Sequence, residues 1–402
     1  MKLVSILLTI AEALKGTFVH LTDIHYDPNY KAGSPVHCLS GKLFGLSCCR
    51  SYNIPIEPHV KANKWGDLSC DTSFLFVNKT FEWIRLNIPD IDFIVYTGDS
   101  VGHHDVTQSV THNIRVINDI DGLFQNYFGN LKVYSSIGNH DTYPIDQTYS
   151  KFNTIFLKNF ANNWGRWLNN SETILKGGYY VTQITERLYV VNINSLLYDN
   201  INLFHLDIAI EQWLWFETTL EYIRNTGGTI WIVNHICPWN GEASTNYTSR
   251  FVETISRYSD IIKYQFYGHV HQDTFTLLSD SNRDIVGFCS VPSSVMLDKH
   301  ESSFRVYKYD TETFDILDYD HYVSDLNATI ARDEIVYHHS YSFNAEYDLD
   351  GVNLNNWIRL YDKIKNNNTI LQKYYHNLNP GLKHSDCDAD CKQNILINIL
   401  PI

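Results

Sequence analysis

The segment Asp92-Phe-Ile-Val-Tyr-Thr-Gly-Asp-Ser-Val-Gly-His103 joins a short apolar run to a loop that carries metal-binding side chains. Its first half is rich in β-branched and aromatic residues, which is typical of a buried strand. Its second half places Asp99 and His103 just after that strand. Ligand sites in α/β proteins form at the carboxyl ends of strands. The segment therefore predicts a strand of an α/β sheet with a functional loop at its end.

The same arrangement occurs four more times along the chain. In each case a predicted strand is followed by polar side chains that can bind a metal ion. The four further segments are Asp23-Ile-His25, Gly138-Asn139-His140-Asp141, Asn234-His235 and Gly268-His269-Val-His271. One such histidine or aspartate alone is usually a surface or core residue, but five segments that each follow a strand are not expected by chance. We predict that the five loops share one crevice.

The apolar pattern of the remaining chain also predicts an α/β layered fold, in which strands alternate with amphipathic helices. Strands are expected at residues 17–22, 92–97, 132–136, 188–193, 229–233, 264–267, 285–289 and 305–309. Helices are expected at 72–88, 207–225 and 353–375. Because the pattern changes at about residue 330, we expect an α/β domain over 16–330 and a small helical C-terminal subdomain over 331–402.

The composition excludes several classes of protein. The chain has 402 residues, of which 44% are hydrophobic and 19% are charged, so it is neither disordered nor fibrous. Its 31 Lys and Arg against 45 Asp and Glu give a net charge of -14, which disfavours binding to nucleic-acid polymers. No long apolar run follows the N-terminal region, which disfavours an integral membrane protein.

The N-terminal region predicts secretion. Met1-Lys2, the apolar run 3–10 and Ala11-Glu-Ala13 together are typical of a signal peptide over residues 1–13, although a buried first strand or helix is the alternative. A secreted or lysosomal location permits disulfides, and the chain has eight cysteines. Five sequons agree with a glycosylated product, at Asn78, Asn169, Asn246, Asn327 and Asn367.

The residue types in the five segments favour a centre of two metal ions. Together the segments supply the ligands that two divalent ions need when one carboxylate bridges them. Aspartate, asparagine and imidazole suit zinc or another first-row metal better than calcium. Two ions about 3.5–4 Å apart can hold a bridging hydroxide and clamp a phosphoryl group. A purely structural zinc site is disfavoured, because such sites usually contain cysteine and these segments contain none.

These segments resemble the calcineurin-like metallophosphoesterases, which implies a four-layer β-sandwich flanked by helices. Further segments resemble acid sphingomyelinase and its secreted phosphodiesterase relatives. They are His37-Cys-Leu-Ser40, Cys48-Cys-Arg50, Trp65-Gly-Asp-Leu-Ser-Cys-Asp71, Gly98-Asp-Ser100 and Cys387-Asp-Ala-Asp-Cys391. The resemblance extends over about residues 16–395. Since Asp23 follows the predicted signal peptide closely, we expect no saposin module before it, as in the acid sphingomyelinase-like phosphodiesterases.

The resemblance implies a role for each residue of the segments. The first zinc ion would be held by Asp23, His25, Asp99 and His271. The second would be held by Asp99, Asn139, His235 and His269, with Asp99 bridging the two. His140 would act as general acid to the leaving oxygen or stabilise the transition-state charge. His103 would support His140; His104 is the alternative, and we prefer His103. Asp141 would orient a ligand.

The resemblance also implies the disulfides Cys38–Cys48, Cys49–Cys70 and Cys387–Cys391. Cys237 lies in His235-Ile-Cys-Pro238, where the family usually has His-x-Pro-Pro, and Cys289 ends a neighbouring predicted strand. We expect these two cysteines to form a fourth disulfide, with two buried free thiols as the alternative.

We therefore predict a secreted dizinc phosphodiesterase, in which a metal-bridging hydroxide attacks phosphorus while His140 protonates the leaving group. Nucleotides and similar small phosphate compounds, such as ATP or CDP-choline, are the preferred substrates. Sphingomyelin, cleaved to ceramide and phosphocholine, is the alternative. A non-catalytic binding protein is disfavoured because all the ligands and His140 are present. An intracellular phosphatase is disfavoured by the signal peptide and cysteines. We expect a monomer without a nucleic-acid partner.

Overall fold

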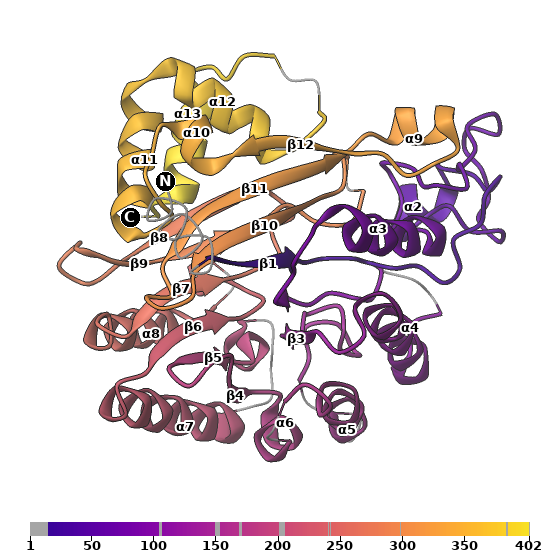
Figure 1. Cartoon of the computed structure of the whole chain (residues 1–402). Coiled ribbons are helices and arrows are strands. Elements are labelled where there is room, and N and C mark those ends of the chain that lie inside the picture. The colour runs from indigo at the N-terminus through magenta and orange to yellow at the C-terminus, as the bar shows by residue number, and fades with distance from the viewer. Residues whose placement is uncertain are drawn as a thin grey trace, which may run out of the picture.

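The structure is a computed structural model of the chain (Figure 1). It describes residues 15–103, 107–148, 153–168, 171–200, 206–239, 241, 243–297, 299–382 and 385–401. The predicted signal peptide over 1–13, His104 and the sequon at Asn169 lie outside the described residues.

The first of two sheets has six strands in the order β12-β11-β10-β1-β2-β3. Strand β1 is parallel to β2 and antiparallel to β10, so that Phe18 lies opposite Phe93 on one side and Tyr307 on the other. The strands are β1 (Lys15–Leu21), β2 (Phe93–Tyr96), β3 (Lys132–Ser135), β10 (Ser303–Asp310), β11 (Ile316–Ser324) and β12 (Tyr337–Ser342).

The second sheet also has six strands, in the order β4-β5-β6-β7-β9-β8. Its central strands β5, β6 and β7 are parallel, so their carboxyl ends lie at one edge of the sheet. The strands are β4 (Tyr180–Gln183), β5 (Leu188–Asn192), β6 (Thr229–Val233), β7 (Ile262–Phe266), β8 (Thr274–Ser279) and β9 (Ile285–Val291).

The two sheets pack face to face through buried aromatic side chains. The ring of Phe18 in β1 lies 5.3 Å from that of Trp231 in β6 and 5.5 Å from that of Phe266 in β7. Such aromatic contacts contribute strongly to core packing. Helices cover the outer faces (Figure 1). They are α3 (Phe74–Asn87), α4 (Val110–Phe128), α5 (Asn153–Trp164), α6 (Glu172–Gly177), α7 (Leu206–Asn225) and α8 (Thr245–Arg257). The predicted four-layer fold is confirmed.

The C-terminal part differs from the prediction in two respects. Strand β12 pairs with β11, so the first sheet continues beyond the expected boundary at residue 330, and the division into two domains remains a prediction. The single helix expected over 353–375 is two helices, because the side chain of Asn367 accepts the backbone N–H groups of Thr369 and Ile370 and starts a new helix. The helices here are α9 (Leu326–Arg332), α10 (Phe343–Tyr347), α11 (Leu354–Asn366), α12 (Asn368–Leu378) and α13 (Ala389–Ile399).

The remaining elements and covalent links complete the fold. A short helix α2 (Leu39–Phe44) follows β1, and a 3-10 helix η1 (Ser195–Tyr198) follows β5. The structure contains the disulfides Cys38–Cys48, Cys49–Cys70, Cys237–Cys289 and Cys387–Cys391. Within the described residues, no helix combines the length and apolarity needed to cross a bilayer.

The described sequons differ in accessibility. Asn246, Asn327 and Asn367 are exposed. Asn78 is half-buried in α3, where its Oδ1 accepts a hydrogen bond from the hydroxyl of Tyr127 at 2.9 Å. Glycosylation remains a prediction, with Asn78 the least accessible of these four positions.

Candidate metal centre

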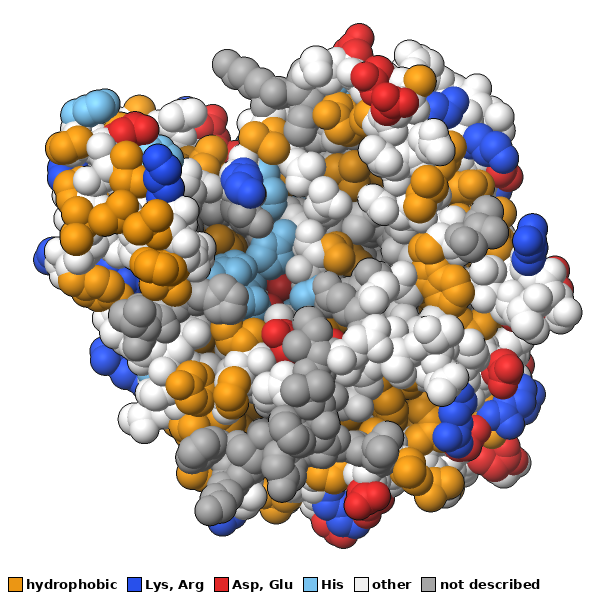
Figure 2. Space-filling model, turned by 180° about the vertical axis from the view of Figure 1, so that it is seen from behind, with side chains coloured by type: hydrophobic (Ala, Val, Ile, Leu, Met, Phe, Trp, Pro, Cys, Tyr) orange, Lys and Arg blue, Asp and Glu red, His pale blue; other side chains and the backbone are white. Residues whose placement is uncertain are grey.

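The five segments singled out in the sequence meet in one hollow, at the carboxyl ends of three parallel strands of the first sheet and two parallel strands of the second. Each strand contributes one loop. Asp23 and His25 follow β1, Asp99 follows β2, Asn139 and His140 follow β3, His235 follows β6, and His269 and His271 follow β7. Figure 2 shows histidine side chains gathered around red carboxylates in this hollow. The structure therefore brings all seven proposed ligands together.

The backbone of these loops adopts conformations that most residues avoid. Five of the seven proposed ligands have φ in the left-handed region, namely Asp23 (50°), His25 (43°), Asp99 (59°), His269 (78°) and His271 (55°). Each such residue costs about 1–2 kcal/mol, and strain of this kind clusters at functional sites. Glycines give the loops room. A Cβ on Gly138 would lie 2.0 Å from Oδ1 of Asp99, so no larger residue fits there.

The proposed first set of ligands lies around Nε2 of His25. Nε2 of His25 lies 3.5 Å from Oδ2 of Asp99 and 3.0 Å from Nε2 of His271. Nε2 of His271 lies 3.5 Å from Oδ1 of Asp23. Asp23 and Asp99 are fully buried, so their charges need a nearby positive charge.

The proposed second set lies on the other side of Asp99. Nε2 of His235 is 3.2 Å from the same Oδ2 of Asp99 and 2.9 Å from Oδ1 of Asn139. Nδ1 of His269 is 3.1 Å from that amide oxygen. Asp99 is therefore the one carboxylate that both sets share, as a bridging ligand requires.

The hydrogen bonds of two buried histidines fit a cation at this centre. Nδ1 of His25 faces the carbonyl of Val101 at 2.8 Å, and Nδ1 of His235 faces that of Thr97 at 2.6 Å. Each Nδ1 therefore donates, which leaves a lone pair on Nε2 of the neutral ring. Each lone pair faces Oδ2 of Asp99, which is also an acceptor, so a cation between them would satisfy both groups. Burial opposes charge on His235, but Asp99 and Asp23 outweigh it and raise its pKa to about 9. The pKa of His25 is instead lowered, by burial and by the neighbouring histidines.

Asp141 supports the ligand loops from behind. Its carboxylate accepts the backbone N–H groups of Gly138 at 2.9 Å, Asp99 at 3.1 Å and Ser100 at 2.8 Å. It thus connects the loop after β2 to the loop after β3. Burial and the neighbouring Asp99 raise the pKa of Asp141 to about 7. Such partners fix the position of ligands without binding the metal themselves.

His140 lies beside the ligands. Its backbone N–H donates to Oδ1 of Asp99 at 2.8 Å, and its ring lies 4.9 Å from that of His25 and 4.6 Å from that of His103. Burial lowers its pKa to about 3, although Asp99 acts in the opposite direction. Among the described residues, none of the groupings of three potential ligands includes His140.

His103 is held by Asp71, an aspartate to which the sequence assigned no role. Asp71 accepts Nδ1 of His103 at 2.7 Å and its backbone N–H at 3.1 Å. The His103 ring stacks on His25 at 4.0 Å, and these two rings with His271 form a third possible ligand grouping. Because Nδ1 of His103 is bound to Asp71, only its Nε2 is available to the hollow.

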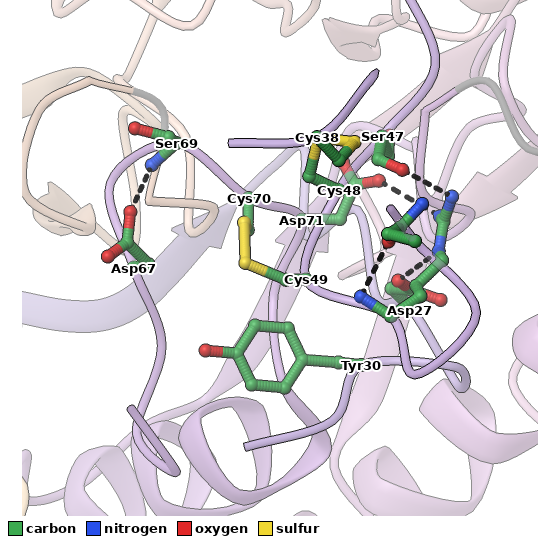
Figure 3. Close-up of a disulfide and its surroundings, with 12 residues drawn as sticks. Asp27, Tyr30, Cys38, Ser47, Cys48, Cys49, Asp67, Ser69, Cys70 and Asp71 are labelled. Carbon is green, nitrogen blue, oxygen red and sulfur yellow. Dashed lines mark hydrogen bonds and ion pairs between the residues drawn. A yellow bond between two sulfur atoms is a disulfide. The ribbon is translucent and has the colours of Figure 1, made fainter. Parts of the chain in front are cut away.

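Behind Asp71 lies a buried arginine. Nη2 of Arg50 is 3.5 Å from Asp71, and its Nε donates to Asp27 at 2.7 Å. Burial alone would raise the pKa of Asp71, but His103 and Arg50 outweigh it and lower that pKa below its usual range. Arg50 and Asp71 are the chain neighbours of Cys49 and Cys70, whose disulfide is drawn in Figure 3. Their positions next to paired cysteines are the signal that could have identified them.

The comparisons with known proteins agree with this geometry. Residues 16–273 match the model of the calcineurin-like phosphoesterases. The chain is 28% identical to sphingomyelin phosphodiesterase A of Dictyostelium discoideum, over 96% of this chain and 66% of that protein. It is 28% identical to sphingomyelinase phosphodiesterase C of the same organism, over 98% and 92%. It is also 28% identical to the human cyclic GMP-AMP phosphodiesterase SMPDL3A, over 94% and 86%.

Fold, site and family model together define a metallophosphoesterase. The chain belongs to the calcineurin-like phosphoesterase family, and it resembles acid sphingomyelinase-like phosphodiesterases over most of its length. The prediction of an enzyme that hydrolyses phosphodiester bonds is confirmed.

Proposed function

We propose that the chain is a dizinc phosphodiesterase. Asp23, His25, Asp99 and His271 hold one ion, and Asn139, His235 and His269 complete the second site together with Asp99. The observation that carries this proposal is the position of Asp99, whose Oδ2 lies within 3.5 Å of Nε2 of His25 and 3.2 Å of Nε2 of His235. When bound, the two ions supply a Lewis acid for phosphoryl oxygens and lower the pKa of water.

The remaining side chains transfer a proton or position the groups that react. His140 donates a proton to the leaving oxygen. Burial disfavours this proton in the free protein, but an anionic phosphate beside the ring favours it. His103 packs against His140 and is kept in orientation by Asp71. Asp141 keeps the loops of Asp99 and Asn139 in place through their backbones.

The preferred substrate is a small phosphodiester or phosphoanhydride such as ATP or CDP-choline. A cavity of about 730 Å³ adjoins His103 and Asp71, and its lining combines Lys42 and Lys299 with Glu57 and with apolar residues such as Leu46. The two lysines can pair with negative charge that a substrate carries beyond the scissile phosphate, while Glu57 and Asp71 balance their charge in the lining. The human relative is named for a nucleotide substrate.

Sphingomyelin is the second candidate. Two relatives from Dictyostelium discoideum are named as sphingomyelin-cleaving enzymes. Exposed apolar side chains beside the cavity, described below, could contact a lipid. We further propose that the protein acts as a monomer in a secreted or vesicular lumen. The support is the predicted signal peptide and the four disulfides, which persist in oxidising compartments.

A parallel assay tests the substrate. Zinc-loaded protein is incubated with ATP, CDP-choline, bis(p-nitrophenyl) phosphate and sphingomyelin in detergent. We expect kcat/KM for the nucleotides to exceed that for sphingomyelin. Equal or faster turnover of sphingomyelin would reverse the order of the two candidates, and no turnover of any of the four would contradict the proposed phosphodiesterase.

A further inference from the structure

We propose that residues 31–64, which we call the disulfide lobe, dock the protein on an anionic lipid surface. The lobe connects β1 to α3 and borders the hollow of the metal centre. Docking of this kind is independent of which phosphodiester the site hydrolyses, and it can be measured without catalysis.

The lobe exposes an unusual cluster of large apolar side chains. Phe44 is 74% exposed, Ile54 63% and Leu43 59%, and α2 contains no buried residue. Together with neighbouring residues they line an apolar groove of about 250 Å³. Figure 2 shows orange side chains gathered on the lobe beside the histidine hollow. Contiguous apolar patches of this kind mark interaction sites.

The covalent structure of the lobe keeps these side chains outside the core. Cys38–Cys48 closes a loop around α2, and Cys49–Cys70 ties the next residue to the segment before α3. The backbone N–H of Leu39 donates to the carbonyl of Ile54 at 2.8 Å, which holds the two walls of the groove together. The exposed apolar side chains therefore lie on a loop that two disulfides hold in place.

The charge of the lobe is opposite to that of the whole protein. Residues 31–64 contain five Lys and Arg and one acidic residue, so the lobe carries +4 within a chain of net charge -14. Arg50 is buried against Asp27, and Lys64 pairs with Asp333. Lys31, Lys42 and Lys61 are exposed. Lys42 precedes Leu43 and Phe44 in α2. Exposed apolar side chains next to lysines are typical of segments that insert into the interface of an anionic membrane.

The apolar groove of the lobe adjoins the cavity beside the candidate metal centre. Leu46 lines both the apolar groove and the larger cavity that reaches His103. A lipid surface in contact with Leu43 and Phe44 would therefore lie at the mouth of the cavity beside the metal centre. The same charge disfavours a second copy of the chain as the occupant, because two lobes face to face would bring like charges together.

Vesicle binding tests this proposal. The metal-free protein is mixed with vesicles of phosphatidylcholine or of an equal mixture of phosphatidylcholine and phosphatidylserine, and bound protein is measured by sedimentation. We expect binding to the mixed vesicles that weakens with salt. The triple variant Leu43→Ser, Phe44→Ser, Ile54→Ser should lose affinity about tenfold or more, since it removes three exposed apolar side chains that docking would bury. Lys42→Glu should weaken binding about fivefold or more.

A matched control separates docking from general hydrophobicity. Ile210→Ser, Leu214→Ser, Tyr222→Ser removes three side chains of similar exposure from α7, on the opposite side of the molecule, and should leave binding unchanged. Thermal unfolding of each variant shows whether it folds. Absence of binding by the wild-type protein, or equal loss in both triple variants, would overturn the proposal. Self-association that only the lobe variant loses, without vesicle binding, would assign the face to a second copy and also overturn it.

Discussion

The strand-end loops and the disulfide lobe lie on two sides of the same hollow, but different forces hold them. The loops carry the proposed metal ligands at the ends of strands from both sheets, and Asp141 connects two of the loops. The lobe has one short helix and is held by two disulfides and the buried pair of Arg50 and Asp27. The sheets thus position the proposed metal ligands, and the lobe supports Asp71, the partner of His103, through Arg50.

Removal of the Cys49–Cys70 disulfide should have the largest effect of the changes considered. Cys49→Ser with Cys70→Ser opens a link across 21 residues and should lower the free energy of unfolding by about 3 kcal/mol. It should also lower kcat, because Arg50 and Asp71 follow the two cysteines. The matched pair Cys387→Ser with Cys391→Ser spans 4 residues and should cost about 2 kcal/mol while leaving kcat unchanged. Equal kcat in both double variants would contradict the role given to the lobe.

A second prediction concerns the stability of the sheet scaffold in acid. His321 in β11 is fully buried, and burial lowers its pKa to about 4, although Asp273 acts in the opposite direction. Between pH 6.5 and pH 4, His321 binds a proton in the unfolded chain but stays neutral in the folded chain. The free energy of unfolding should therefore fall by about 2 kcal/mol between pH 7 and pH 5. Denaturant unfolding at both pH values measures this.

The variant His321→Gln should remove this part of the pH dependence, whereas His338→Gln, on the exposed side of β12, should keep it. An unchanged slope in His321→Gln would show that other groups set the acid stability of the scaffold.

The smallest of these effects concerns the orientation of His103. Asp71→Asn keeps the shape of the side chain but removes the charge that holds Nδ1 of His103. We expect kcat to fall about tenfold or more with unchanged metal content. Its control is Asp67→Asn, a partly exposed residue of the same loop that accepts the backbone N–H of Ser69 (Figure 3). Similar kcat values for the two variants would show that Asp71 does not position His103.

The same contrast explains what the sequence could predict. The strands that precede Asp99 and His235 have a local apolar signal, and ligand loops form at the carboxyl ends of such strands, so the fold and the candidate ligands could be predicted. The link from Arg50 through Asp71 to His103 has no such periodic signal, since it depends on how two disulfides fold the lobe. Strand β12, with the polar sequence Tyr-His-His-Ser-Tyr-Ser, forms because β11 offers it an edge. The helix break at Asn367 depends on a single side-chain cap.

The central claim is that the strand-end loops hold two metal ions while His140 works beside them without binding metal. Metal analysis combined with phosphodiesterase activity tests it in the wild-type protein, His140→Ala and Asp99→Ala. We predict two zinc ions per chain in the wild type and in His140→Ala, with kcat of His140→Ala lower by about 10²–10⁴. Asp99→Ala should lose both metal and activity. Full activity in His140→Ala, or wild-type metal content in Asp99→Ala, would contradict the account.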